Sequence, residues 1–234
     1  MSKFSLIESI RKKNGHVLFA LIDPDFKNDK ILNQILDKIN NSEFNAILVG
    51  GSSISDDKLI SRLIHIKNNT NLPIILFPGS SKQVTNQIDS MLYLNLISGR
   101  NPKYLIEEQV ESAIFIKENN IETIPTAYIL LDGGEKTSVH KVSETSPLDM
   151  NNYEMILSHA LAGEYLGNKL IYFDCGSGSR KIMNYQLLNR IKQSINIPIM
   201  VGGGIKRLEE INKLVENGAS YVVVGNLLES GFLE

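Results

Sequence analysis

Eight short apolar runs recur along the chain, and each ends in a turn that contains Gly, Asp, Pro or Ser. Runs of this length and composition, bounded by such turn residues, are typical of buried β-strands. The strands are predicted over residues 17–22, 46–49, 73–77, 91–97, 123–131, 170–173, 197–201 and 221–224.

The segments between these runs mostly carry apolar residues at helical spacing. Examples are residues 31–39, 59–67, 155–165, 185–195 and 208–215, and Pro102 begins a predicted helix that carries Ile106, Val110 and Ile114. Apolar strands alternating with helices predict a parallel sheet covered by helices, and eight repeats favour a closed (β/α)8 TIM barrel. The gap between Ser80 and Met91 is short, so we expect its helix to be missing. No linker divides residues 1–234, which predicts a single barrel domain.

The composition excludes several classes of protein. A hydrophobic fraction of 42% and a net charge of −2 fit a globular enzyme and argue against nucleic-acid binding. No apolar run reaches the length of a transmembrane helix, and residues 1–15 lack the apolar core of a signal peptide. Cys175 is the single cysteine, which fits a reducing compartment, so we expect a cytoplasmic protein.

Two glycine-containing turns follow the last two predicted strands. Residues 201–205 read VGGGI, and residues 222–226 read VVVGN. In (β/α)8 barrels the loops after strands 7 and 8 commonly bind a phosphate group through backbone N–H groups. This pair of turns therefore predicts a phosphate site.

Oxygen-bearing side chains follow the first two strands. Asp23 and Asp25 flank Pro24, and Ser52 follows the second strand. Mg²⁺ takes oxygen ligands and often bridges to substrate phosphates, so a magnesium site is one interpretation. The other is that one of the aspartates caps the next helix, and the residues alone leave both open.

Asp174 directly follows the sixth strand and precedes a glycine turn. It could act as a general base, or it could only cap the turn. Cys175 is interpreted as a buried filler, because no partner histidine is evident. The guanidinium of Arg100 could bind a diphosphate, or it could lie in solvent.

The polar stretch 136–152 follows the fifth strand and is long for a connection between a strand and a helix. Long connections of this kind either close over an active site or remain solvated loops. The sequence leaves open whether residues 136–152 form a lid or a solvated loop.

Six segments together resemble the geranylgeranylglyceryl phosphate synthases, which are prenyltransferases of ether-lipid biosynthesis related to the bacterial heptaprenylglyceryl phosphate synthases. The resemblance extends from Leu21 to Asn226. Its segments are residues 21–25 (LIDPD), 49–52 (VGGS), 98–102 (SGRNP), 172–178 (YFDCGSG), 201–205 (VGGGI) and 224–226 (VGN).

The resemblance implies a modified barrel without its third helix and a reaction between sn-glycerol 1-phosphate and a polyprenyl diphosphate, here geranylgeranyl diphosphate. It implies Mg²⁺ as cofactor, bound by Asp23 and Ser52. Asp174 and Tyr172 are the implied catalytic residues. The implied substrate-binding residues are Tyr172, Phe173, Asp174, Cys175, Gly176, Ser177, Gly178, Gly203, Gly204, Gly225, Asn226 and Arg100.

The chain departs from the family at two positions, with Asp174 in place of the usual Glu and Cys175 in place of Ala or a similar residue. The family also implies a homo-oligomer that works near a membrane surface, where its lipid product belongs. Two alternatives remain: another barrel enzyme acting on a small phosphorylated metabolite, and a non-catalytic phosphate-binding homologue. The second rests on Asp174 and on the end of the chain at Glu234, soon after Asn226.

Overall fold

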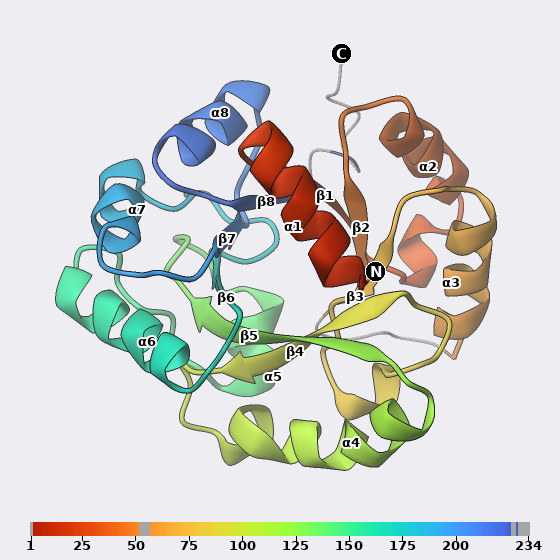
Figure 1. The fold of residues 1–234 in the computed structure, drawn as a ribbon, viewed down its shortest axis with the longest axis horizontal. Coiled ribbons are helices and arrows are strands. Elements are labelled where there is room, and N and C mark those ends of the chain that lie inside the picture. The colour runs from red at the N-terminus through yellow and green to blue at the C-terminus, as the bar shows by residue number, and fades with distance from the viewer. Residues whose placement is uncertain (1, 52–56, 226–227, 229–234) are drawn as a thin grey trace.

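Eight parallel strands close into a barrel in the order in which they occur in the sequence (Figure 1). The computed structural model describes residues 2–51, 57–225 and 228. The predicted (β/α)8 barrel is confirmed, and every strand begins and ends within two residues of its predicted range. The strands are β1 (Val17–Ile22), β2 (Ala46–Val49), β3 (Ile74–Leu76), β4 (Ser90–Leu96), β5 (Glu122–Leu130), β6 (Leu170–Asp174), β7 (Ile199–Gly202) and β8 (Tyr221–Val224).

Side chains alternate between the inside and the outside of the barrel, as the two-residue period of a strand requires. Val17 and Phe19 of β1 belong to the cluster inside the barrel, whereas Leu18 and Ala20 pack in the layer between the strands and the helices. The parallel register pairs Tyr128 with Tyr172 and then Leu130 with Asp174. Tyr172 and Asp174 therefore point into the barrel, at the ends of the strands where a (β/α)8 fold places its active site.

In the described part of the chain, a helix follows each of β1, β2, β4, β5, β6 and β7, but none follows β3. Only a 3₁₀ turn, η2 (Ser81–Gln83), lies between β3 and β4, which confirms the predicted loss of the third helix. Within the described part of the chain, no helix has the length and apolar character needed to cross a bilayer. The barrel helices are α2 (Leu32–Asn40), α3 (Leu59–Asn68), α4 (Glu108–Glu118), α6 (Tyr153–Tyr165), α7 (Tyr185–Lys192) and α8 (Leu208–Glu216).

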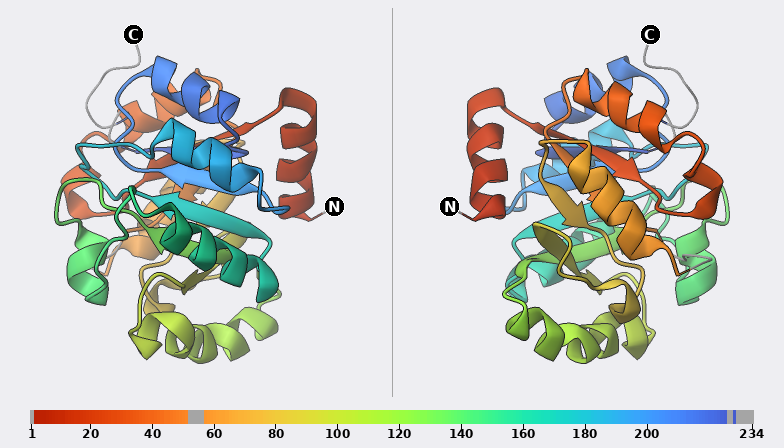
Figure 2. Two further views of the ribbon diagram at one scale, coloured as in Figure 1. Left: turned by 90° about the vertical axis from the view of Figure 1, so that its left-hand side faces the viewer. Right: turned by 90° about the vertical axis from the view of Figure 1, so that its right-hand side faces the viewer.

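An additional helix, α1 (Lys3–Asn14), covers the amino-terminal end of the barrel, and the sequence analysis did not predict it. Its Ile7 is buried among the interior side chains, and Glu8 accepts a hydrogen bond from the hydroxyl of Tyr221. Glu122 at the start of β5 accepts hydrogen bonds from the first backbone N–H groups of this helix. Figure 2 shows α1 at one end of the barrel and α5 (Ser138–Ser143) at the other. The end opposite α1 is therefore the one where loops form a site.

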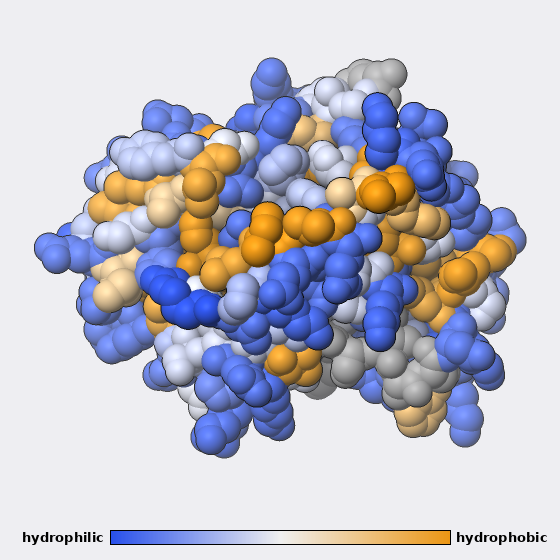
Figure 3. Space-filling model, turned by 90° about the horizontal axis from the view of Figure 1, so that it is seen from below, coloured by the Kyte–Doolittle hydropathy of each residue, from blue (hydrophilic) through white to orange (hydrophobic). Residues whose placement is uncertain are grey.

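The helix predicted after β4 is present, but the apolar residues that indicated it do not form its buried face. Ile106, Val110 and Ile114 are 56%, 64% and 72% exposed, whereas the inner face presents Gln109 and Ser112. Figure 3 views this side of the molecule and shows apolar side chains gathered along it. The helix begins with a π-helical turn, η3 (Lys103–Glu107), before α4. Because no third helix fills the space beside β4, the inner face of α4 borders a groove at Gln109 and Ser112, and only Ile116 near its end packs in the core.

Candidate active site

A cavity opens at the carboxyl ends of the strands, and we call it the rim pocket. Closure of the barrel brings together side chains from loops that are far apart in the sequence. Of the residues predicted for the site, the rim pocket is lined by Asp23, Tyr172, Asp174, Ser177, Gly203, Gly204 and Gly225.

Asp174 is a buried carboxylate with two hydrogen bonds inside the pocket wall. Its Oδ2 accepts from the hydroxyl of Tyr128 at 2.5 Å, and its Oδ1 accepts from the backbone N–H of Gly176 at 2.8 Å. Only 6% of the residue is exposed. The carboxylate is therefore held in one orientation, with its charged group beside the cavity.

Burial raises the pKa of Asp174, because a low-dielectric surrounding disfavours the charged form. The hydrogen bonds from Tyr128 and Gly176 act in the opposite direction, since they stabilise the carboxylate. A raised pKa makes this group a better proton acceptor than an exposed aspartate. Burial and the neighbouring Asp174 also raise the pKa values of Tyr128 and Tyr172, so both tyrosines remain protonated donors.

Three aromatic rings form the wall beneath this carboxylate. The ring centroids of Tyr128 and Tyr172 lie 5.3 Å apart, and Phe77 packs against both at 5.9 and 5.5 Å. The position of Tyr172 also requires a glycine at residue 202, because a Cβ there would lie 2.5 Å from the Tyr172 hydroxyl oxygen. The sequence Gly202-Gly203 therefore makes room for a tyrosine as well as for a ligand.

Gly203 and Gly204 have positive φ angles of 83° and 76°, a region that favours glycine. A Cβ at Gly203 would lie 2.8 Å from Asp174 Oδ1 and 2.6 Å from the backbone nitrogen of Gly176. The turn after β7 thus lies directly against the acidic turn after β6. This arrangement presents backbone rather than side chains to the cavity, as phosphate-binding loops do.

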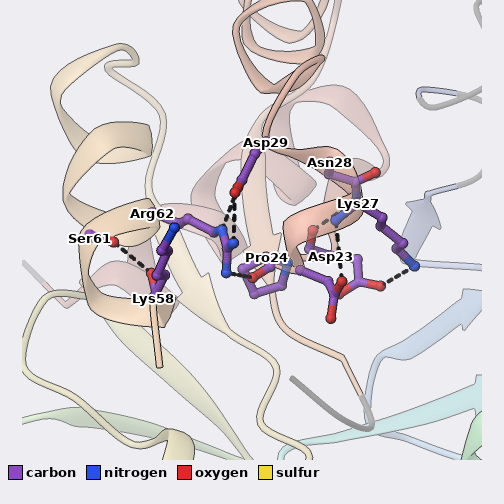
Figure 4. Close-up of polar contacts among 9 residues, drawn as sticks. Asp23, Pro24, Lys27, Asn28, Asp29, Lys58, Ser61 and Arg62 are labelled. Carbon is purple, nitrogen blue, oxygen red and sulfur yellow. Dashed lines mark hydrogen bonds and ion pairs between the residues drawn. The ribbon is translucent and has the colours of Figure 1, made fainter. Parts of the chain in front are cut away.

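Asp23 lies on the loop after β1, where two other side chains hold the backbone (Figure 4). The amide of Asn28 donates to the carbonyl of Asp23 at 2.9 Å. The buried guanidinium of Arg62 on α3 donates to the carbonyl of Pro24 at 3.0 Å and binds both carboxylate oxygens of Asp29. A bidentate contact of this kind fixes direction as well as distance, so the loop is preorganised.

The two carboxylate oxygens of Asp23 differ in their surroundings. Oδ2 forms an ion pair with Lys27 Nζ at 2.6 Å, whereas the buried Oδ1 has no hydrogen-bond partner among the described residues. A buried oxygen without a partner suits a hard cation, which takes oxygen ligands. Asp25 instead accepts a hydrogen bond from the backbone N–H of Lys27 and caps η1 (Phe26–Asn28). The sequence had left open that one of the two aspartates is a helix cap, and Asp25 has this role. No cluster of three or more His, Cys, Asp or Glu side chains occurs in the described ranges. Asp23 therefore fits Mg²⁺ as a single carboxylate ligand.

An apolar groove adjoins the rim pocket where the third helix is missing. The two cavities share Gly51, Phe77 and Val139. The groove runs between β4 and α4, and its walls include Val84, Met91, Tyr93, Leu94, Tyr104, Ser112 and Val142. Its surface is mostly apolar, so it can hold a hydrocarbon chain that extends from the rim pocket.

The segment 136–152 contains the short helix α5, capped by the side chain of Thr137. Thr137 and Val139 line the rim pocket, and Leu148 forms a bridge beside Leu131 through its hydrogen bond to Leu130. Because Thr137 and Ser143 are buried, the solvated-loop interpretation does not describe this segment. It forms part of the roof of both cavities, and its closure over a ligand stays a prediction.

Several predicted substrate-binding residues lie outside the rim pocket. Phe173 and Cys175 alternate with Tyr172 and Asp174, so their side chains pack in the layer between the strands and the helices. Burial raises the pKa of the Cys175 thiol far above its usual value, which agrees with its interpretation as a filler. Gly178 is exposed and lies outside the pocket wall.

Arg100 does not reach the rim pocket. Its guanidinium donates to the carbonyls of Ile97 and Gly99 and lies 3.2 Å from His159 on α6. The loop after β4 directs this side chain toward α6, and Arg100 is not among the residues that line the rim pocket. Ser52 and Asn226 were also predicted for the site, and both lie outside the described residues.

Sequence reasoning missed Tyr128, Lys27 and the residues of the groove. Tyr128 stands at an inward position of β5, which strand alternation could have identified. Lys27 lies four residues after Asp23, close enough to pair with it on a turn. The short gap between Ser80 and Met91 predicted the missing helix, but no local pattern shows that a groove between β4 and α4 takes its place.

Comparison with known proteins agrees with this arrangement. Residues 8–234 match the PcrB family. The chain is 44% identical to the geranylgeranylglyceryl phosphate synthase of Flavobacterium johnsoniae over 94% of this chain and 90% of that protein. It is 34% identical to the synthase of that name from Pyrococcus furiosus over 95% of this chain and 88% of the other.

Among solved structures, the chain is similar to (S)-3-O-geranylgeranylglyceryl phosphate synthase from Thermoplasma acidophilum in complex with its substrate sn-glycerol-1-phosphate. The TM-score is 0.91 at 32% sequence identity, and the alignment covers 98% of this chain and 92% of the other.

The hydrogen bond from Tyr128 should hold the pKa of Asp174 below the value that burial alone would produce. We therefore expect Tyr128→Phe to raise this pKa, because the carboxylate loses a donor while its burial remains. The measurement is an NMR titration of the aspartate carboxyl carbons. Tyr93→Phe is the control, since its hydroxyl donates to the carbonyl of Gln109 instead. An unchanged or lower Asp174 pKa in Tyr128→Phe would contradict this assignment.

Proposed function

This chain belongs to the PcrB family, and we propose that it is a geranylgeranylglyceryl phosphate synthase. The reaction joins the C3 hydroxyl of sn-glycerol 1-phosphate to C1 of geranylgeranyl diphosphate and releases diphosphate. One observation carries the proposal: a buried carboxylate and a glycine turn share the rim pocket, and this pocket continues into an apolar groove. A polar substrate and a long hydrocarbon substrate can therefore meet at one point.

The glycerol phosphate belongs at the turns after β6, β7 and β8. Gly203, Gly204 and Gly225 line this part of the pocket with backbone, and Ser177 adds a side chain. The similar enzyme from Thermoplasma acidophilum binds sn-glycerol-1-phosphate, which supports the same substrate here. Anchoring the phosphate places the glycerol hydroxyl beside Asp174 and lowers the entropic cost of reaction.

Asp174 is the general base, and Tyr172 provides the wall against which the substrate lies. As the glycerol C3 oxygen forms its bond to the allylic C1, it transfers its proton to the Asp174 carboxylate. The C1–O bond to diphosphate breaks at the same time, and its electron pair leaves with the diphosphate. Tyr128 and Gly176 keep the carboxylate in place, which is needed because an aspartate side chain is short.

Mg²⁺ is the proposed cofactor, and Asp23 would hold it through Oδ1. When bound, Mg²⁺ would neutralise charge on the departing diphosphate. The buried Oδ1 of Asp23, which has no hydrogen-bond partner within the described ranges, supports this proposal, as does the preorganised loop that carries it. Ser52 is proposed as the second ligand on the family resemblance alone.

The groove between β4 and α4 would hold the prenyl chain. Each buried CH₂ group contributes about 0.8 kcal/mol, so a twenty-carbon tail gains most of its affinity from this surface. The open face after β3 also gives an amphiphilic substrate a route into the groove. A homo-oligomeric state, a cytoplasmic location and work near a membrane surface stay predictions.

The proposal is tested by incubating the protein with sn-glycerol 1-phosphate and geranylgeranyl diphosphate, followed by mass analysis of the product. We expect geranylgeranylglyceryl phosphate in the presence of Mg²⁺ and little product after treatment with EDTA. A mixture of prenyl diphosphates of different lengths identifies the preferred chain. Absence of the ether product under all these conditions would contradict the proposed function.

Asp174→Asn should lower kcat by about 10²- to 10⁴-fold, because the amide cannot accept the hydroxyl proton. The variant keeps the volume of the side chain, so the binding of glycerol phosphate should change far less. Steady-state kinetics check this expectation. The control is Asp37→Asn on the exposed surface of α2, where activity should be unchanged. Full activity in Asp174→Asn would exclude Asp174 as the base.

Ser112→Phe should shorten the groove, since Ser112 lies on the inner face of α4 and lines it. We expect kcat/KM for geranylgeranyl diphosphate to fall by about tenfold or more, whereas geranyl diphosphate is accepted as before. Ile114→Phe is the matched control, because this residue is 72% exposed on the outer face of the same helix. Equal losses for both chain lengths, or no loss, would place the prenyl chain elsewhere.

A further inference from the structure

The charges around the rim pocket do not match the substrates proposed for it. Asp23, Asp25 and Asp174 line the cavity, yet both substrates carry phosphate groups. Among the described residues that line it, Lys27 is the single one with a positively charged side chain. Like charges brought together in a partly enclosed site are costly unless a cation offsets them. This inference rests on the proposed function, because the mismatch arises from its substrates.

The ion pair of Lys27 occupies the carboxylate that is proposed to bind the cation. Lys27 Nζ lies 2.6 Å from Asp23 Oδ2, and the two residues stand four apart on the turn after β1 (Figure 4). The ammonium and a divalent cation would therefore compete for the same negative charge. An ammonium group beside Asp23 lowers the affinity of this carboxylate for Mg²⁺, because the positive charge of the ammonium offsets the negative charge that attracts the cation.

Two side chains hold the backbone of the loop, whereas the side chain of Lys27 is largely exposed to solvent. Arg62 binds the carbonyl of Pro24, and Asn28 binds the carbonyl of Asp23. The Lys27 side chain is 55% exposed, so its ammonium can turn on four flexible methylene groups without moving the loop. Lys27 can therefore leave Asp23 and remain beside it.

We propose that Lys27 is a diphosphate-binding residue that exchanges partners. Without substrate it neutralises Asp23, and once a cation binds Asp23 the ammonium donates to an oxygen of the prenyl diphosphate. The position of Lys27 indicates that it contacts the diphosphate rather than the glycerol phosphate. The cation and the phosphates it bridges must lie beside Asp23, where Lys27 is, whereas the glycine turn that would hold the monophosphate lies against Asp174.

Lys27→Met tests the exchange because it should change two affinities in opposite directions. Mn²⁺ bound in place of Mg²⁺, followed by electron paramagnetic resonance, should bind about two- to fivefold more tightly, since a competing ion pair is lost. Inorganic pyrophosphate with Mg²⁺ present, followed by calorimetry, should bind about tenfold more weakly, because a charge-assisted hydrogen bond is lost. The KM for geranylgeranyl diphosphate should rise to the same extent.

The control is Lys3→Met, which removes a lysine–aspartate pair with Asp89 at the opposite end of the barrel. This variant should leave the affinities for Mn²⁺ and for pyrophosphate unchanged, and also the KM values for geranylgeranyl diphosphate and glycerol phosphate. In Lys27→Met, inorganic phosphate should bind as it does to the wild type. Weaker or unchanged binding of Mn²⁺, unchanged binding of pyrophosphate, or a rise confined to the KM for glycerol phosphate would each overturn the proposal. The two binding measurements need no turnover, so an inactive wild type would contradict the proposed function and still leave Lys27 testable.

Discussion

Closure of the parallel sheet is the constraint on which the rest of this structure depends. Hydrogen bonds between β8 and β1 complete the ring, and the fixed register places the carboxyl ends of all strands at one rim. The opposite end is covered by α1, whose Ile7 and Glu8 contact the barrel interior. Asp23 from β1 and Asp174 from β6 therefore meet in one cavity, although 151 residues separate them in the sequence.

The missing third helix determines what this cavity can accept. A helix after β3 would cover β4 and bury its outer surface, whereas the short turn η2 leaves a groove that continues from the rim pocket. The inner face of α4 is correspondingly polar at Gln109 and Ser112, whereas Val110 and Ile114 of the same helix are exposed. One local omission thus converts a barrel for small phosphorylated molecules into one with room for a hydrocarbon chain.

Asp174 shows how the fold makes a buried charge tolerable. A carboxylate in an apolar surrounding is costly unless hydrogen bonds compensate it. Tyr128 and Gly176 supply two such bonds, and the aromatic wall of Tyr172 and Phe77 keeps the group apart from water. The close approach of Gly203 to Asp174 leaves no space for any larger residue. The Asp174 carboxylate and the glycine turn after β7 therefore depend on each other for their geometry.

The amino-acid sequence by itself determined the eight strands and the missing helix, and it singled out residues after β1, β6 and β7 that line the rim pocket, because these features rest on short-range patterns of apolar residues and turns. Tertiary structure alone decided the rest. The sequence left open whether Arg100 binds a diphosphate or lies in solvent, and the loop after β4 directs its guanidinium toward His159. The stripe of Ile106, Val110 and Ile114 predicted a buried face and lies outside. Tyr128 was unrecognised until the barrel brought it to Asp174, and Lys27 was unrecognised until the turn after β1 directed it to Asp23. A residue pattern records local conformation, whereas the partner of a side chain is chosen by contacts between segments that are distant in the chain or by the direction in which a turn points it.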